Sequence, residues 1–215
     1  MASRLPAESM SWFQNETERR GNMSITEERM KLRTFGCAVL LALVVVTPDF
    51  AQQAAPGRQP DVIFVPTPND VVNAMLKLAN VSATDVVYDL GSGDGRIVIA
   101  AAKMYGARGV GIDIDPERTR EATANAQKNG VADKVTFRTE DLFVADISPA
   151  TVVTLYLSGP VNSRLAPKLM KELRPGTRIV SHAFDLGNWR PQQRTSVSQR
   201  PIFLWVVPAP TDTRR

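Results

Sequence analysis

A glycine-rich run at residues 89–95 (DLGSGDG) holds the side chains of this 215-residue sequence best suited to binding a ligand. It follows an apolar, β-branched stretch and precedes a helix-like stretch. Glycines at the carboxyl end of a strand let backbone N–H groups approach a bound molecule closely. The run therefore predicts a binding loop, whose candidate residues are Asp89, Gly91, Ser92, Gly93, Asp94 and Gly95.

A second acidic residue, Asp113, ends the next apolar stretch, 24 positions after Asp89. A carboxylate at that place can accept hydrogen bonds from both hydroxyls of a ribose. Two cofactor classes then compete. A dinucleotide would bring its pyrophosphate close to Asp94, and like charges repel. S-adenosylmethionine (AdoMet) has a ribose, an ammonium group and a sulfonium but no phosphate, so it suits both Asp89 and Asp94 better.

Strand-like and helix-like stretches alternate from residue 61 onward and must position this loop. We predict strands over 85–90, 108–114, 134–138, 151–157 and 177–184, then a hairpin of 195–199 and 202–207. We predict one helix capped by Thr67 and further helices over 96–105, 116–129 and 162–173. Such alternation is typical of an α/β fold, here a mostly parallel seven-stranded sheet with helices on both faces and a C-terminal hairpin.

Several segments resemble a known enzyme family. The run 89–95, followed by residues 109–113 (GVGID), looks like motifs I and II of the Rossmann-like class I AdoMet-dependent methyltransferases. Residues 64–68, 150–157, 173–178 and 180–184 are similar to small single-domain protein-lysine methyltransferases. That family includes broad-specificity archaeal enzymes and mitochondrial enzymes that modify the adenine nucleotide translocase and the ATP synthase c-subunit. The resemblance covers about residues 61–207.

The resemblance implies an AdoMet-dependent enzyme that methylates protein lysines. Asp141 and Leu142 match the family's adenine-contacting turn, Ile114 follows the ribose-binding Asp113, and Thr67 is expected at the cofactor's carboxylate. The candidate catalytic residues are Tyr156, in the substrate-facing motif, and His182, near the end of the stretch 177–184. A helix N-cap alone is the alternative role for Thr67. The alternatives are a core aromatic at the sheet edge for Tyr156 and a packed or hydrogen-bonded structural histidine for His182.

The amino-acid composition narrows the choice of metal sites and binding partners. With one cysteine and one histidine, no Cys-rich or multi-histidine metal site is expected, and we predict no metal. A net charge of +4 gives no support for nucleic acid as a partner. The expected partner is a protein with exposed lysines, and the expected state is a monomer. Methylation of a small-molecule or lipid-linked acceptor stays open, as does a non-catalytic AdoMet-binding module.

The segment ahead of the predicted domain (61–215) has the pattern of a targeting sequence. Residues 1–29 are a polar leader or the artefact of an upstream start site, and residues 30–55 resemble a signal peptide or membrane anchor. Residues 35–47 are apolar and uncharged, so membrane contact is expected there. Residues 56–60 are a linker. An exported (periplasmic or secreted) or membrane-anchored protein is thus favoured over a cytoplasmic one. The family's mitochondrial members carry a membrane-targeting segment instead, and Ser158-Gly159-Pro160 departs from the family after the fourth strand.

Overall fold

The computed structural model describes residues 61–209, and the statements that follow concern that part of the chain. The predicted leader, signal peptide or anchor, and linker lie outside the described residues. Within residues 61–209, none of the helices combines the length and the apolar character that crossing a membrane requires.

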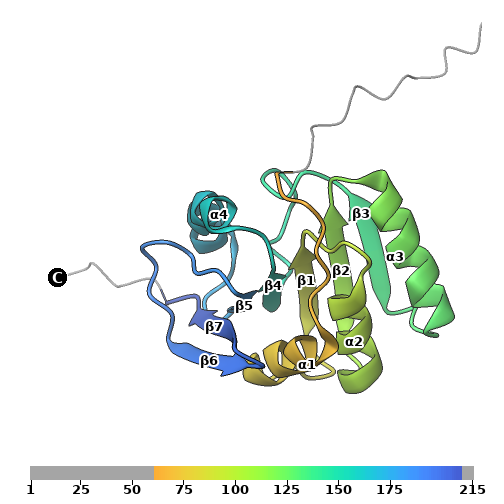
Figure 1. Ribbon diagram of the computed structural model, residues 1–215, viewed down its shortest axis with the longest axis horizontal. Coiled ribbons are helices and arrows are strands. Elements are labelled where there is room, and N and C mark those ends of the chain that lie inside the picture. The colour runs from red at the N-terminus through yellow and green to blue at the C-terminus, as the bar shows by residue number, and fades with distance from the viewer. Residues whose placement is uncertain (1–60, 210–215) are drawn as a thin grey trace, which may run out of the picture. The chain divides into compact units, whose positions relative to one another are not determined.

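Seven strands form a single sheet in the order β3-β2-β1-β4-β5-β7-β6 (Figure 1). β1 to β5 are parallel, whereas β7 runs antiparallel to both β5 and β6. The predicted α/β fold, with its mostly parallel seven-stranded sheet and C-terminal hairpin, is confirmed. The elements are α1 (Asn69–Leu78), β1 (Val86–Leu90), α2 (Arg96–Tyr105), β2 (Arg108–Asp113), α3 (Pro116–Lys128), β3 (Val135–Thr139), β4 (Val152–Leu155), α4 (Gly159–Glu172), β5 (Arg178–His182), β6 (Gln193–Val197) and β7 (Arg200–Val206).

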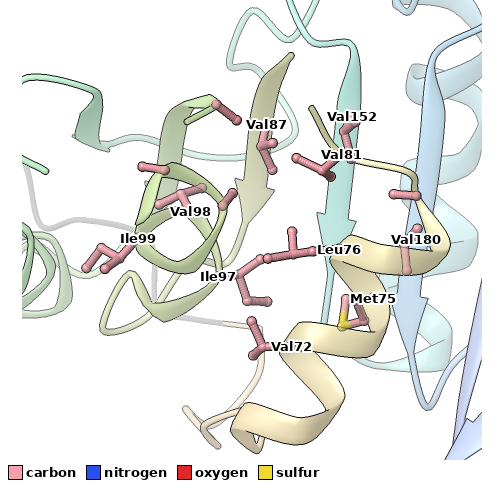
Figure 2. Close-up of a cluster of buried hydrophobic side chains, with 14 of the residues drawn as sticks. Val72, Met75, Leu76, Val81, Val87, Ile97, Val98, Ile99, Val152 and Val180 are labelled. Atoms are coloured by element: carbon pink, nitrogen blue, oxygen red, sulfur yellow. The ribbon is translucent and has the colours of Figure 1, made fainter. Parts of the chain in front are cut away.

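One face of the sheet is covered mainly by α1 and α2. Figure 2 shows Leu76 of α1 and Ile97 of α2 pointing toward one another, and Met75 of α1 belongs to the same buried cluster. Alternate residues of the central strands, such as Val87 and Val152, complete this core because successive side chains of a strand point to opposite faces. The apolar spacing of both helices thus places them against β1, β4 and β5.

The other face of the sheet packs against α4. Leu165 and Leu169 of this helix are fully buried in one apolar cluster with Leu155, Ile179 and Trp205 of the sheet. Burial on both faces explains why the central strands are continuous apolar runs rather than alternating ones. The prediction of helices on both faces is confirmed.

Several element ends differ from the sequence prediction, and three of the differences lie next to Thr67, Tyr156 and the segment Ser158-Gly159-Pro160. Helix α1 begins at Asn69 with Pro68 as its N-cap residue, so Thr67 is not the cap; a residue before proline is biased toward extended backbone. Helix α4 begins at Gly159 rather than 162, because Pro160 suits a first helical turn. Strand β4 ends at Leu155, which leaves Tyr156 in the segment that leaves the sheet.

Candidate functional site

A cavity of about 400 Å³ opens at the carboxyl ends of β1, β2 and β4. It lies beside the point where the strand order reverses, since β1 leads outward to β2 and β3 while β4 lies on its other side. Ligands of α/β proteins bind at such switch points. The volume is within the range of small-molecule and cofactor sites.

Most of the predicted site residues line this cavity. They are Thr67, Asp89, Gly91, Ser92, Asp94, Asp113, Ile114, Asp141, Leu142 and Tyr156. Gly93 and Gly95 belong to the same loop without lining the cavity, and His182 does not line it either. Residues predicted from separate stretches of sequence are therefore brought together at one place.

Gly93 and Gly95 are needed for the shape of the loop. Gly93 has a φ of +51°, and a Cβ atom there would lie 2.1 Å from Cε2 of Phe64. Gly95 is the N-cap residue of α2 with a φ of +79°, and its Cβ would lie 2.5 Å from Cζ of Phe137. Side chains rarely adopt such backbone angles, so both the conformation and the space require glycine.

Asp89 is a buried carboxyl group at the floor of the cavity. Thr154 Oγ1 donates a hydrogen bond to its Oδ1 at 2.7 Å from the neighbouring strand. Burial raises the pKa of Asp89 to about 7, against the opposing hydrogen bond from Thr154 and with a further contribution from the charges of Asp113 and Asp94. A cationic group bound nearby would favour the ionised carboxylate.

Asp113 is fixed by the backbone around it. Its Oδ2 accepts a hydrogen bond from the Gly93 N–H at 2.8 Å, and its Oδ1 accepts one from the Asp115 N–H at 3.0 Å. These bonds hold the carboxylate on the cavity wall with lone pairs left to accept ligand hydroxyls. Near it, the buried Ser92 Oγ has no hydrogen-bond partner within residues 61–209. A buried hydroxyl of this kind fits a polar ligand atom.

Asp94 was predicted to bind the cofactor, but its carboxylate is already paired with a neighbouring side chain. Arg96 Nη2 lies 2.5 Å from Asp94 Oδ2, and Arg96 Nη1 donates to the Thr67 carbonyl oxygen at 2.9 Å. The guanidinium therefore ties the glycine loop to the segment ahead of α1. Asp94 lies on the cavity wall as a paired carboxylate.

A wall of the cavity formed by residues 61–66 was absent from the predicted site. Within it, the Phe64 ring lies against Gly93, and the Arg118 guanidinium carbon lies 5.1 Å from the ring centroid. Arg118 itself also lines the cavity. The segment is irregular, so periodicity gives no signal for it; its similarity to the family at residues 64–68 was the available clue.

Tyr156, which lines the cavity, stacks on His182, which does not. Their ring centroids are 3.9 Å apart with 30° between the planes. His182 is buried, and its Nδ1 lies 3.4 Å from Thr67 Oγ1. Burial and the nearby charge of Arg200 lower the pKa of His182, which favours the neutral imidazole. Tyr156 therefore faces the cavity while His182 supports it from behind.

The part of the chain that the structure describes has no cluster of three or more His, Cys, Asp or Glu side chains suited to a metal ion. Its polar groups instead fit AdoMet. Asp89 can receive the ammonium group, Asp113 can receive the ribose hydroxyls, and the unpaired Ser92 hydroxyl can meet a polar atom.

The chain is similar to several methyltransferases. The family model described as "ANTKMT methyltransferase domain" matches residues 89–193. A protein-lysine N-methyltransferase of Saccharolobus islandicus (strain REY15A) is 48% identical over 153 residues, which cover 69% of this chain and 95% of that protein. A lysine N-methyltransferase of Rattus norvegicus, named for the ATP synthase c-subunit, is 31% identical, with 81% of this chain and 78% of that protein covered.

A solved structure with a different described acceptor is also similar. It is described as an RNA methyltransferase from Salinibacter ruber in complex with S-adenosyl-L-homocysteine. It is 56% identical with a TM-score of 0.67, and the match covers 69% of this chain and 98% of that one. The bound product of AdoMet agrees with the ligand for which the cavity residues are suited.

Proposed function

We propose that this chain, which belongs to the family of AdoMet-dependent protein-lysine N-methyltransferases, transfers methyl groups to the ε-amino groups of lysines in proteins. The class I methyltransferase fold and the dependence on AdoMet expected from the sequence are confirmed by the similar methyltransferases. The lysine acceptor is our proposal, and the charge of the cavity supports it.

Among the charged side chains that line the cavity, carboxylates outnumber guanidinium groups. Six aspartates line it against two arginines, Arg96 and Arg118. Each guanidinium has a carboxylate partner at 2.5 Å, Asp94 for Arg96 and Glu121 for Arg118. An excess of negative charge attracts a cationic amine and repels the phosphates of a nucleic acid. This observation favours lysine over RNA as the acceptor.

The wall around Tyr156 supplies the environment that the reaction needs. When bound, AdoMet supplies a methyl group on a sulfonium; the lysine nitrogen bonds to that carbon as the carbon–sulfur bond breaks and its electron pair stays on sulfur. The lysine must first lose a proton to solvent, since its ordinary pKa is about 10.4. Burial against Tyr156, Leu157 and Phe64 lowers that pKa, and the Tyr156 ring offers a surface against which the neutral amine can be aligned.

The experiment that tests this proposal is transfer of radioactive methyl groups from AdoMet by the full-length chain. It uses a lysate of the source organism, separated afterwards into protein, RNA, lipid and small-molecule fractions. Label in protein that is recovered as methyl-lysine after hydrolysis is the expected result. Label in RNA would overturn the lysine acceptor and support the kind of acceptor described for the Salinibacter protein. Label in lipid or small molecules would overturn it in favour of the other acceptor class.

We also propose that the chain is exported or membrane-anchored and acts as a monomer. The apolar, uncharged residues 35–47 within the signal-like residues 30–55 support the first point. Fractionation of cells is expected to place the full-length chain outside the cytoplasmic fraction. Light scattering of the purified chain is expected to give the monomer mass, and a dimer mass would contradict that state.

A further inference from the structure

We propose that Asn162, in the first turn of α4, is a positioning residue that fixes the Tyr156 ring through the turn after β5. This inference rests on the proposed function, because it takes Tyr156 to be part of the acceptor side of the cavity. Asn162 does not line the cavity itself. Its influence must pass through the residues that it holds.

Asn162 is fully buried between α4 and the sheet, and its amide makes two hydrogen bonds. Nδ2 donates to Ser181 Oγ and to the Phe184 carbonyl oxygen, each at 3.2 Å. Ser181 Oγ donates to the same carbonyl at 2.6 Å. Asn162 Oδ1 has no partner within residues 61–209. A buried amide oxygen without a partner lowers the stability of the fold. A role of Asn162 in positioning its partners therefore explains this network better than a role in stability does.

That geometry is a tight turn directly after β5. The Phe184 N–H donates to the His182 carbonyl oxygen at 2.9 Å, which closes a three-residue turn around Ala183. Ala183 has a φ of +67°, a conformation that residues with a Cβ atom rarely adopt. Such a conformation persists only where its surroundings impose it. Asn162 and Ser181 hold the turn from the α4 side, and the Pro201 carbonyl accepts the Ala183 N–H at 2.8 Å from β7.

The conformation of the turn around Ala183 determines where the Tyr156 ring lies. Leu155 of β4 pairs with Ser181 of β5, so Tyr156 and His182 are the next residues along the two strands. Their rings stack at 3.9 Å. If the turn relaxed, His182 would shift and Tyr156 would lose the surface that supports it. The chain of contacts thus runs from a residue on one face of the sheet to the cavity at its edge.

The first test is a spectroscopic one that needs no acceptor. His182 is the single histidine of the chain, so tag-free full-length protein gives one set of imidazole proton signals. The stacked Tyr156 ring shifts these signals, and Tyr156→Leu gives the unstacked reference. We expect Asn162→Leu to move them at least halfway to that reference. The matched control is Ser163→Ala, at an exposed neighbour whose hydroxyl donates to the Gly159 carbonyl oxygen at 2.9 Å, and it should leave them unchanged.

The second test separates turnover from cofactor binding. We expect Asn162→Leu to lower kcat at least tenfold while the Kd for AdoMet stays within twofold, and Ser181→Ala to lower kcat by a smaller factor. If Asn162→Leu does not fold, Ser181→Ala carries both tests. Folded variants with unmoved imidazole signals would overturn the inference even where lysine methylation is intact. Methylation of RNA alone, with moved signals, would overturn the proposed lysine acceptor and leave the positioning role standing.

Discussion

Thr154 donates a hydrogen bond at 2.7 Å to the carboxylate of Asp89, directly across the pairing of β1 and β4. Both side chains are buried, and Thr154 is fully so. A single hydroxyl donor does not offset the cost of burying the charge, so the pKa of Asp89 is raised to about 7. The stability of the ligand-free chain and its affinity for AdoMet are therefore both expected to depend on the protonation of Asp89.

The stability of the ligand-free chain is expected to depend on Asp89. Because the folded-state pKa is raised, the folded state holds the proton more tightly. The resulting stabilisation is complete below pH 4 and is lost as the pH rises through about 7. Between pH 5 and 8 the free energy of unfolding should fall by about 2–3 kcal/mol more in the native chain than in Asp89→Asn. Urea unfolding of both chains at the two pH values measures this; parallel pH profiles would contradict it.

The affinity for AdoMet is expected to rise with pH over the acidic side of neutrality. Binding of an ammonium group favours ionised Asp89, and in the free chain that form becomes more abundant as the pH approaches 7. The Kd measured by calorimetry should therefore fall between pH 5.5 and 7, by up to about tenfold per pH unit. In Asp89→Asn the Kd should be weaker and nearly independent of pH over this range. A native Kd that does not change would remove Asp89 from contact with the ligand's charge.

The parts of the site that the sequence could predict are those fixed by strand ends. Asp89 and Asp113 follow apolar β-branched runs, and parallel strands bring their carboxyl ends to one edge. The alternation of strand-like and helix-like stretches was sufficient to place both aspartates at strand ends. For this reason the glycine loop and the two aspartates lie where they were expected.

The contacts that fix the exact positions of the site residues depend on tertiary packing, so periodicity and spacing in the sequence do not predict them. Phe64 lies in an irregular segment, so nothing in its periodicity places it against Gly93. Threonine is a common N-cap residue, and Thr67 was therefore predicted to cap the first helix. Pro68 takes that position instead, and the Thr67 hydroxyl lies near His182. Asn162 resembles any polar residue of a helix until the fold brings it to the Phe184 carbonyl.

Asp113 is expected to contribute to AdoMet affinity through ribose recognition. Asp113→Ala removes charge-assisted hydrogen bonds and leaves two backbone N–H groups without their acceptor, which should weaken binding by about 1–3 kcal/mol. Calorimetry measures this loss. The control is Glu117→Gln, an exposed position in the first turn of α3 that does not line the cavity. An unchanged Kd for Asp113→Ala would show that the ribose is held elsewhere.

The contact between Gly93 and Phe64 is expected to behave as a coupled pair. Gly93→Ala places a Cβ atom against the Phe64 ring and strains a backbone with a φ of +51°. The ring lines the cavity, so its displacement should weaken AdoMet binding. A double-mutant cycle with Phe64→Leu measures the coupling. The Gly93→Ala loss in affinity should be smaller in the Phe64→Leu background; additive losses would mean that the strain alone is responsible.

Tyr156 is expected to act on turnover rather than on cofactor binding. Its ring lies on the cavity wall, stacked on His182, whereas Asp89 and Asp113 are the residues expected to hold the polar parts of AdoMet. Tyr156→Ala removes the surface against which the acceptor amine is aligned, so kcat should fall by at least tenfold with little change in the Kd for AdoMet. Tyr156→Phe keeps the ring and its stacking, and it should retain most of the activity. If Tyr156→Phe is as slow as Tyr156→Ala, the hydroxyl rather than the ring is the active part. A larger effect on the Kd than on kcat would move Tyr156 to the cofactor side of the cavity.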